Sequence, residues 1–155
     1  MLRLCLQHAD TRHRALLTRA FVRRCLVAAL NGPAEFTVRI VNADEGLQLN
    51  AGYRHGDHAT NVLTFPYAHE PVVRADLVIC APVVEKESKE QGISLLHHYA
   101  HLLVHGALHA QGWDHQDDGQ AADMQALEAF ILATLGVPDP YATRRASRRA
   151  ASRAK

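Results

Sequence analysis

The run His105-Gly106-Ala107-Leu108-His109-Ala110-Gln111-Gly112-Trp113-Asp114-His115 decides how the C-terminal half of this chain must fold. His105 and His109 are four residues apart, so on a helix both imidazoles lie on one face, with Cβ atoms about 5–6 Å apart. In an unbroken helix, His115 would lie roughly 9 Å further along the axis and on another face. Glycine readily adopts the left-handed conformation that ends helices. We therefore expect a long helix that stops near Gly112, after which the chain turns back.

Three imidazoles that converge in this way are typical ligands of a metal ion. Three protein ligands with an open fourth position describe a catalytic zinc site, whereas structural zinc usually has four protein ligands. The chain has 11 histidines, so pairs at spacing four arise by chance, but the full pattern with a correctly placed glycine is much rarer. We predict that His105, His109 and His115 bind one Zn²⁺ per chain, although three imidazoles also accept nickel or copper. His101 continues the same helical series and is expected to support a ligand or contact substrate.

Gly106 occupies the position where zinc peptidases of the His-Glu-x-x-His type carry their general base. Glycine costs a helix interior about 1 kcal/mol relative to alanine, so we expect either substrate or a packed neighbour to approach the backbone there. Asp114 could orient a ligand histidine, form a turn or act as a base. A peptidase mechanism is disfavoured, and the metal would do most of the chemistry through its bound water.

Length, composition and charge describe one domain with a basic end. The chain has 155 residues, 48% of them hydrophobic, which suits one soluble domain, and its apolar stretches are too short to span a membrane. Six of the 17 Lys and Arg residues lie in residues 144–155, which leaves 11 against 16 Asp and Glu in residues 1–143. We expect a single mildly acidic domain over 1–143. The basic tail over 144–155 is either a solvated, flexible end or an electrostatic arm for nucleic acid.

The three cysteines and the N-terminus favour the cytoplasm. Cys5, Cys25 and Cys80 are odd in number, widely spaced and set in apolar runs, which favours buried free thiols. The N-terminus lacks the continuous apolar core of a signal peptide. A cytoplasmic protein without membrane association is expected, and its oligomeric state stays open.

Hydrophobic periodicity predicts an α+β fold. Alternating patterns predict strands at 2–6, 36–40, 61–65 and 75–80, the third of them ended by Pro66. Helical patterns cover 11–30, a short segment from a cap at Asn42 to about 54, a segment with Pro82 in its first turn, the histidine helix capped by Ser94, and a last helix from Asp117 or Asp118 to 135. This order implies a single domain with a small four-stranded mixed sheet, covered by about five helices, and a metal site at the end of the long helix.

With these elements placed, the histidine run resembles the signature of the bacterial YbeY family of single-strand-specific metalloendoribonucleases, the rRNA maturation factors. The segments Asn50-x-x-Tyr53-Arg54 and Thr60-Asn61-Val62-Leu63-Thr64-Phe65 resemble a loop and a strand of that family, and Ala75-Asp76-Leu77 resembles its Gly-Asp-Ile segment. The resemblance covers most of residues 35–135. The chain departs from the family's usual tyrosine, serine and glycine at Trp113, Thr64 and Ala75.

The resemblance implies an α+β fold in which the three histidines hold a metal, usually zinc, at the floor of a cleft. It also implies that Arg54 faces the substrate. A guanidinium can give the charge that develops on a scissile phosphate two charge-assisted hydrogen bonds in a fork. The ordinary interpretation of Arg54 is a surface cation at a helix end. Thr60 and Asn61 either begin a structural strand or line the cleft.

We therefore expect hydrolysis of single-stranded RNA, with Arg54 and the metal-bound water as the catalytic groups. The resemblance further implies maturation of the 3′ end of 16S rRNA, ribosome quality control, and contact with the small ribosomal subunit and a ribosome-associated GTPase. The leading alternative is a non-catalytic ribosome-assembly factor whose metal mainly stabilises the fold. A third candidate, another metal-dependent hydrolase such as a peptidase, is disfavoured by Gly106. Attack by water or by the ribose 2′-hydroxyl, the cleavage sequence, the native metal and the role of the tail stay open.

Overall fold

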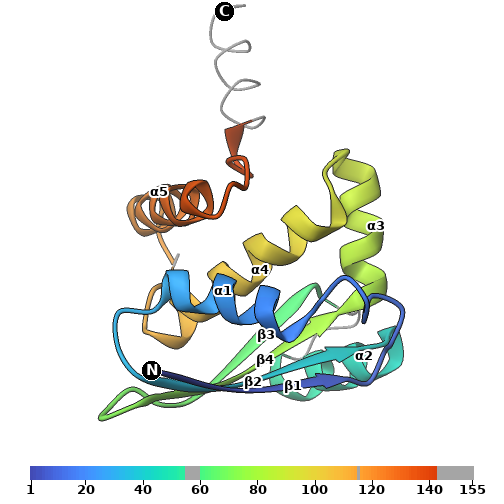
Figure 1. Cartoon of the computed structure of the whole chain (residues 1–155), viewed down its shortest axis with the longest axis horizontal. Coiled ribbons are helices and arrows are strands. Elements are labelled where there is room, and N and C mark those ends of the chain that lie inside the picture. Colours follow the sequence, from blue (N-terminus) through green and yellow to red (C-terminus); the bar gives the residue numbers. More distant parts are fainter. Residues whose placement is uncertain (55–59, 115, 143–155) are drawn as a thin grey trace, which may run out of the picture.

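The computed structural model describes residues 1–54, 60–114 and 116–142, which form a mixed sheet and a layer of helices (Figure 1). The elements, in chain order, are β1 (Leu2–His8), α1 (Arg19–Ala29), β2 (Ala34–Val41), α2 (Ala43–Arg54), β3 (Val62–Ala68), β4 (Val73–Cys80), α3 (Ala81–Gln91), α4 (Leu95–Ala110) and α5 (Asp118–Thr134). The α+β class, the four-stranded mixed sheet and the five helices confirm the prediction.

The sheet has the strand order β1-β2-β4-β3. β1, β2 and β4 are parallel, and β3 is antiparallel to β4 at the edge. The prediction that the third strand ends at Pro66 is wrong, because β3 continues to Ala68 and Pro66 pairs with Ala75. Proline has no backbone N–H to donate to a neighbouring strand, and an edge strand tolerates that loss because one of its two sides is unpaired.

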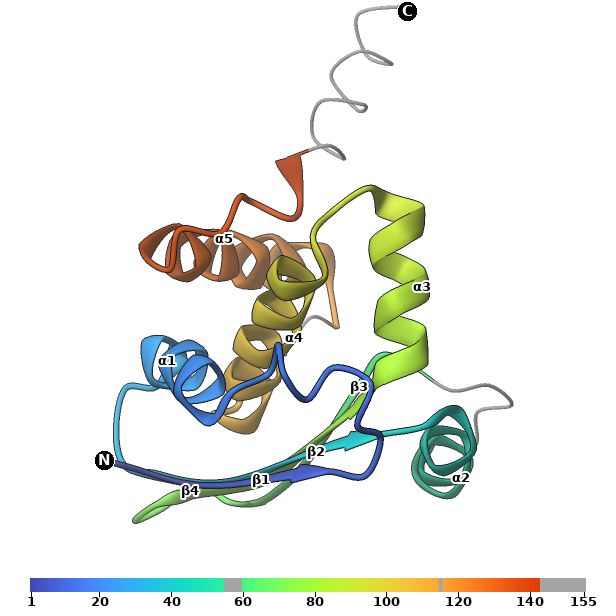
Figure 2. The ribbon, with the colours of Figure 1, turned by 45° about the vertical axis from the view of Figure 1, so that its right-hand side comes forward.

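Alternation along the strands turns one face of the sheet toward the helices. Phe36, Val38 and Ile40 of β2 and Leu77 and Ile79 of β4 are buried in the main core, as the two-residue period of a strand requires. Figure 2 shows α1, α3, α4 and α5 on this side of the sheet, with α4 between the sheet and α5. The long histidine helix is therefore the centre of the helical layer.

The opposite face of the sheet is only partly covered. Leu63, Val78 and Cys80 form a small second cluster there, against which Leu49 of α2 packs. Further along the same face, Cys5 of β1 is exposed, so the prediction that all three cysteines are buried is wrong for this one. The period of two places Cys5 opposite the inward-facing Leu2 and Leu4, which an apolar run alone does not reveal.

The predicted helix over 11–30 is wrong in its first half. Residues 12–16 form turns, and α1 begins at Arg19 after the N-cap Thr18, whose hydroxyl accepts from the Phe21 N–H at 3.2 Å. The turn segment is held by His13, whose ring nitrogens lie 2.7 Å from the Tyr99 hydroxyl and 2.9 Å from Glu85 Oε2. These long-range contacts override the helical periodicity of the segment.

Gly106 brings α4 close to the sheet. A Cβ at this position would lie 2.7 Å from Leu77 Cδ2 of β4 and 3.5 Å from Thr64 Oγ1 of β3. Of the two explanations predicted for this glycine, the structure supports the packed neighbour. The close approach fixes the height of α4 above the strands.

No helix within the described residues is long and apolar enough to cross a membrane. The predicted tail over 144–155 lies outside those residues, so the division into a domain over 1–143 and a basic tail stays a prediction.

Candidate metal centre

Helix α4 ends near Gly112, as the sequence predicts. Gly112 has a φ of 101°, a left-handed conformation that favours glycine. The N–H of Trp113 donates to the carbonyl of Leu108 at 3.1 Å, and the N–H of Gly112 donates to the carbonyl of His109 at 3.0 Å. This pair of bonds is the Schellman motif. It turns the chain away from the helix axis directly after the last helical histidine.

His105 and His109 face each other on the last turns of α4. Their Nε2 atoms lie 3.0 Å apart, and their ring centroids are 4.5 Å apart. Two imidazoles on one tetrahedral zinc, with Zn–N bonds of about 2.0–2.1 Å, place their nitrogens about 3.3 Å apart. The observed spacing is close to that value, so the pair fits a shared metal ion with a small adjustment.

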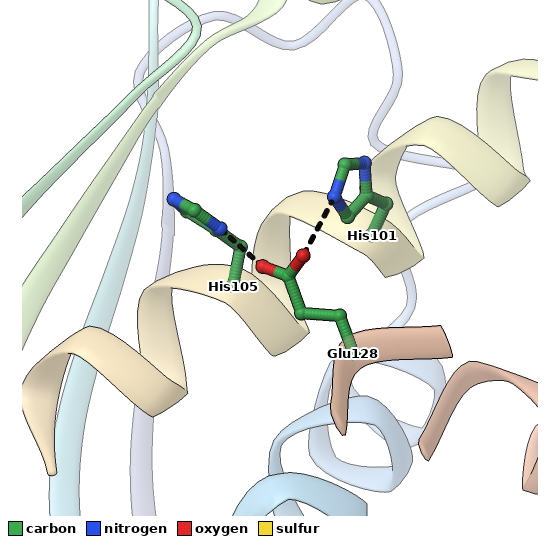
Figure 3. Close-up of side chains that lie close together, drawn as sticks. All are labelled: His101, His105 and Glu128. Carbon is green, nitrogen blue, oxygen red and sulfur yellow. Dashed lines mark hydrogen bonds and ion pairs between the residues drawn. The ribbon is translucent and has the colours of Figure 1, made fainter. Parts of the chain in front are cut away.

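Glu128 of α5 binds the ring nitrogen of His105 that faces away from His109. Its carboxylate Oε1 is hydrogen-bonded to His105 Nδ1 (Figure 3). A carboxylate that accepts from Nδ1–H fixes the tautomer, so the lone pair of the ring lies on Nε2, toward His109. Glu128 is fully buried, and its contact with His105 crosses from one helix to another.

The second carboxylate oxygen of Glu128 is also engaged. Tyr141, which follows α5, donates its hydroxyl hydrogen to Oε2. His101 Nε2 lies 3.0 Å from the same hydroxyl and 3.6 Å from Glu128 Oε2. His101 and His105 are therefore joined through one carboxylate and one phenol.

These contacts keep Glu128 ionised. Burial alone raises the pKa of its carboxyl, but His101 at 3.6 Å and the hydrogen bonds from His105 and Tyr141 outweigh burial and lower the pKa to about 2. At neutral pH the side chain is an acceptor only. The negative charge of the Glu128 carboxylate therefore lies beside the His105 ring.

His101, His105 and Glu128 are themselves a group that could hold a metal ion, since one ligand atom from each lies within 4.8 Å of the others. Figure 3 shows the carboxylate between the two rings. An ion in this position would replace the hydrogen bonds that Glu128 makes to His105 and Tyr141. The described residues thus offer two arrangements that share His105.

Two of the predicted functional groups cannot be placed. His115 lies outside the described residues, and so does the side chain of Arg54, whose backbone is the last residue of α2. The predictions for both residues therefore stand as made.

The remaining predicted residues lie in two places. Asp114 is half-buried and lines a hollow of about 370 Å³ with Gly112, Trp113 and three others, namely Gln111, Gln120 and Asp123. Asn61 donates from Nδ2 to Glu87 Oε1 at 2.9 Å, and partly buried Thr60 precedes it. The hollow begins at Gln111, shortly after His109, whereas Asn61 immediately precedes β3.

Glu87 connects Asn61, the residue before β3, to α4. Its Oε1 also lies 2.9 Å from Nε2 of the buried His98. The hydrogen bond with His98 lowers the pKa of the Glu87 carboxyl, and the bond from Asn61 adds to it, so that together they outweigh burial. Glu87 thus holds the Asn61 amide, and His98 holds Glu87.

Sequence reasoning missed Glu128, although a signal exists. Met124, Glu128, Ile131 and Leu132 are buried at helical spacing on α5. A carboxylate within such an apolar stripe is rarely buried unless it is paired. The stripe could have identified Glu128 as a residue that needs a partner, but not which histidine supplies it.

Comparisons with known proteins agree on one family. The family model described as Endoribonuclease YbeY matches residues 6–136. A relative named Endoribonuclease YbeY from Methylibium petroleiphilum is 59% identical over 142 residues, 92% of this chain and 95% of the relative. Another with that name, from Paracidovorax citrulli, is 62% identical over 131 residues, 84% of this chain and 86% of the relative. The solution structure of TM1509 from Thermotoga maritima has a similar fold, with a TM-score of 0.57 at 22% identity over 87% of this chain and 91% of that one.

Proposed function

Because this chain belongs to the YbeY endoribonuclease family, we propose that it is a metal-dependent endoribonuclease that cleaves single-stranded RNA. The observation that carries the proposal is the pair of Nε2 atoms, 3.0 Å apart, on His105 and His109. The alternative of a non-catalytic assembly factor is not favoured, because the relatives are named as endoribonucleases.

The metal ligands in this proposal are His105, His109 and His115, and the metal is Zn²⁺. Support comes from Glu128, whose bond to Nδ1 of His105 leaves Nε2 as the coordinating atom. The Schellman turn at Gly112 supports the third ligand, because it redirects the chain three residues before His115. A bound zinc with three imidazole ligands supplies Lewis acidity and lowers the pKa of water at its open position.

The chain's own groups prepare this chemistry. Glu128 holds His105 in one tautomer, and Arg54 stabilises the negative charge that develops on the scissile phosphate. Lysine could not replace Arg54 there, because only a guanidinium donates two parallel hydrogen bonds to a phosphate. Asp114, His101, Thr60 and Asn61 are proposed to support the ligands or contact RNA.

We extend the proposal to the cell on the strength of family membership. The substrate is rRNA, the reaction matures the 3′ end of 16S rRNA, and the protein serves ribosome quality control in the cytoplasm. It contacts the small ribosomal subunit and a ribosome-associated GTPase. The six basic residues within 144–155 favour contact with RNA phosphates, which makes binding dependent on salt.

A cleavage assay with two variants tests the proposed function. His109→Ala should lose both zinc and cleavage of an unstructured RNA, because a ligand is removed. Arg54→Glu should keep zinc but reduce cleavage by roughly 10²- to 10³-fold, as expected when a transition-state donor is lost. Arg24→Glu, an exposed position on α1, is the control and should retain activity. Full cleavage by zinc-free His109→Ala would refute the assignment.

The chemistry of the product ends separates the two nucleophiles. Hydrolysis by water leaves a linear phosphate, whereas attack by the ribose 2′-hydroxyl leaves a 2′,3′-cyclic phosphate. Mass spectrometry of a defined oligonucleotide product distinguishes them, and a cyclic phosphate would exclude attack by water.

A further inference from the structure

Glu128 is unusual because both oxygens of a fully buried carboxylate are engaged by groups from other segments. Oε1 accepts from His105 Nδ1 on α4. Oε2 accepts from the hydroxyl of Tyr141, which lies beyond the end of α5. A buried carboxylate without partners is strongly destabilising, so its presence needs these partners. The two bonds also fix the plane of the carboxylate.

The directions of these bonds follow from chemistry. An ionised carboxylate only accepts, so Nδ1 of His105 and the hydroxyl of Tyr141 both donate to it. The Tyr141 oxygen then accepts from Nε2 of His101 at 3.0 Å. The chain of donors therefore runs from His101 through Tyr141 to Glu128, and from His105 to Glu128. It leaves the Nε2 atom of His105 to face Nε2 of His109.

Tyr141 is itself held in place. Its backbone N–H donates to Asp139 Oδ1 at 2.8 Å. Its ring meets the His101 ring edge to face, with centroids 5.3 Å apart and planes at 86°. The turn after α5 and the contact with the His101 ring therefore both fix the direction in which the phenol points toward Glu128.

We propose that Glu128 and Tyr141 are a positioning pair for the metal centre: Glu128 orients His105 as an Nε2 ligand, and Tyr141 orients Glu128. This rests on the proposed metal site, and it assigns the segment after α5 to that site although it lies over 30 residues beyond His109. Neither residue contacts the metal. Both act through the ring of His105.

Zinc affinity tests the pair directly. Chelator competition on the full chain measures the dissociation constant of zinc for the wild type, Glu128→Gln, Tyr141→Phe and the double variant. Loss of a residue that orients a metal ligand weakens affinity by roughly 10- to 100-fold. We expect that range for Glu128→Gln and a smaller loss for Tyr141→Phe. The double variant should bind zinc no more weakly than Glu128→Gln, because Tyr141 acts only through Glu128.

The chain offers matched controls for both changes. Glu85→Gln alters another carboxylate paired with a histidine, His13, at 2.9 Å. Tyr67→Phe removes another phenol bonded to a carboxylate, Asp76, at 2.6 Å. Both controls should bind zinc within about twofold of the wild type, a range expected for changes remote from the ligands. Urea unfolding of the zinc-free proteins shows whether each variant is folded.

A second readout needs no metal. Imidazole ¹⁵N NMR of the zinc-free wild type should show His105 as the Nδ1–H tautomer, and Glu128→Gln should shift it toward a mixture of tautomers. A purely structural role for Glu128 would lower stability without changing the tautomer. Tyr141→Phe provides the same test if Glu128→Gln does not fold.

The outcomes separate this inference from the proposed function. If Glu128→Gln and Tyr141→Phe retain wild-type zinc affinity and tautomer while His109→Ala loses zinc, the positioning pair is refuted and the metal site stands. If Glu128→Ala and His101→Ala lose zinc while His109→Ala keeps it, the metal lies among His101, His105 and Glu128. That result would overturn both the positioning pair and the proposed ligand set.

Discussion

At residue scale, Gly106 sets the separation between α4 and the sheet. Its place in a helix predicted that something approaches the backbone, and the structure identifies Leu77, fully buried in β4. The sequence could not name this neighbour, because the contact joins residues 29 positions apart. The same holds for Glu128, whose partner His105 lies on another helix.

The substitution Gly106→Ala tests this packing. Alanine improves helix propensity by about 1 kcal/mol, but its Cβ would lie 2.7 Å from Leu77 Cδ2, and overpacking a core costs about 1–3 kcal/mol. Because Leu77 has no exposed surface into which it could move, the clash should prevail. We expect the free energy of unfolding to fall by about 1 kcal/mol in urea denaturation.

Gly32→Ala is the control for this change. Among the residues that the structure describes, no heavy atom lies within 4 Å of a Cβ at position 32, so stability should change by no more than about 0.5 kcal/mol. An equal loss in both variants, or a gain at position 106, would contradict the packing argument.

At the scale of elements, the sequence predicted a helix end correctly where the capping residue interacts with the backbone of that same helix. Ser94 caps α4 by accepting from the His97 N–H at 3.0 Å, Asp117 caps α5 by accepting from the Gln120 N–H at 2.7 Å, and Gly112 ends α4, all as predicted. The prediction failed over 11–17, where contacts of His13 with distant residues determine the backbone, and at Pro66, where the edge position of β3 matters. Local chemistry is visible in a sequence, whereas neighbours across the fold are not.

The turn at Gly112 should matter for metal binding as well as for stability. In Gly112→Ala the Cβ meets no atom of the described residues within 4 Å, so the strain lies in the backbone, at a cost of about 1–2 kcal/mol. We expect this loss of stability together with weaker zinc affinity, because the turn directs the chain toward the proposed ligand His115. Urea denaturation and chelator competition measure the two effects.

Gly92→Ala provides a matched control at the end of α3. Gly92 also has a positive φ, 65°, and a Cβ there would meet no atom within 4 Å in the described part of the chain. It should lose similar stability with unchanged zinc affinity. If both variants bind zinc equally, the turn at Gly112 has no special role in the metal site.

At the scale of the whole molecule, pairs of a carboxylate and a histidine, each with one buried member, tie the helical layer together. Glu87 joins Asn61, before β3, to His98 of α4. Glu85 joins α3 to His13, and Glu128 joins α5 to α4. The fold class and the helix that carries His105 could be predicted from periodicity, but these cross-links could not.

The Glu87 link predicts a pH dependence of stability. Its pKa is lowered by the hydrogen bond with His98, so the unfolded chain, with an ordinary glutamate pKa of about 4.3, binds more protons in the acid range. The link therefore contributes its full stabilisation above about pH 4.3 and loses it as pH falls through the lowered pKa. Urea unfolding between about pH 5 and 3 should show a shallower acid loss in Glu87→Gln than in the wild type.

The exposed Glu90, whose Oε1 lies 3.8 Å from Lys86 Nζ, is the control for this measurement. Surface ion pairs contribute little, so Glu90→Gln should follow the wild-type profile. A Glu87→Gln profile that also coincides with the wild type would show that the Glu87 link does not stabilise the fold.

The most direct test of the central claim is the position of zinc in crystals of the metal-loaded protein, measured by anomalous diffraction at the zinc edge. We predict one strong peak per chain, within about 2.0–2.1 Å of Nε2 of both His105 and His109, with Glu128 still hydrogen-bonded to Nδ1 of His105. A peak bonded to the carboxylate of Glu128 and to His101, away from His109, would contradict the account.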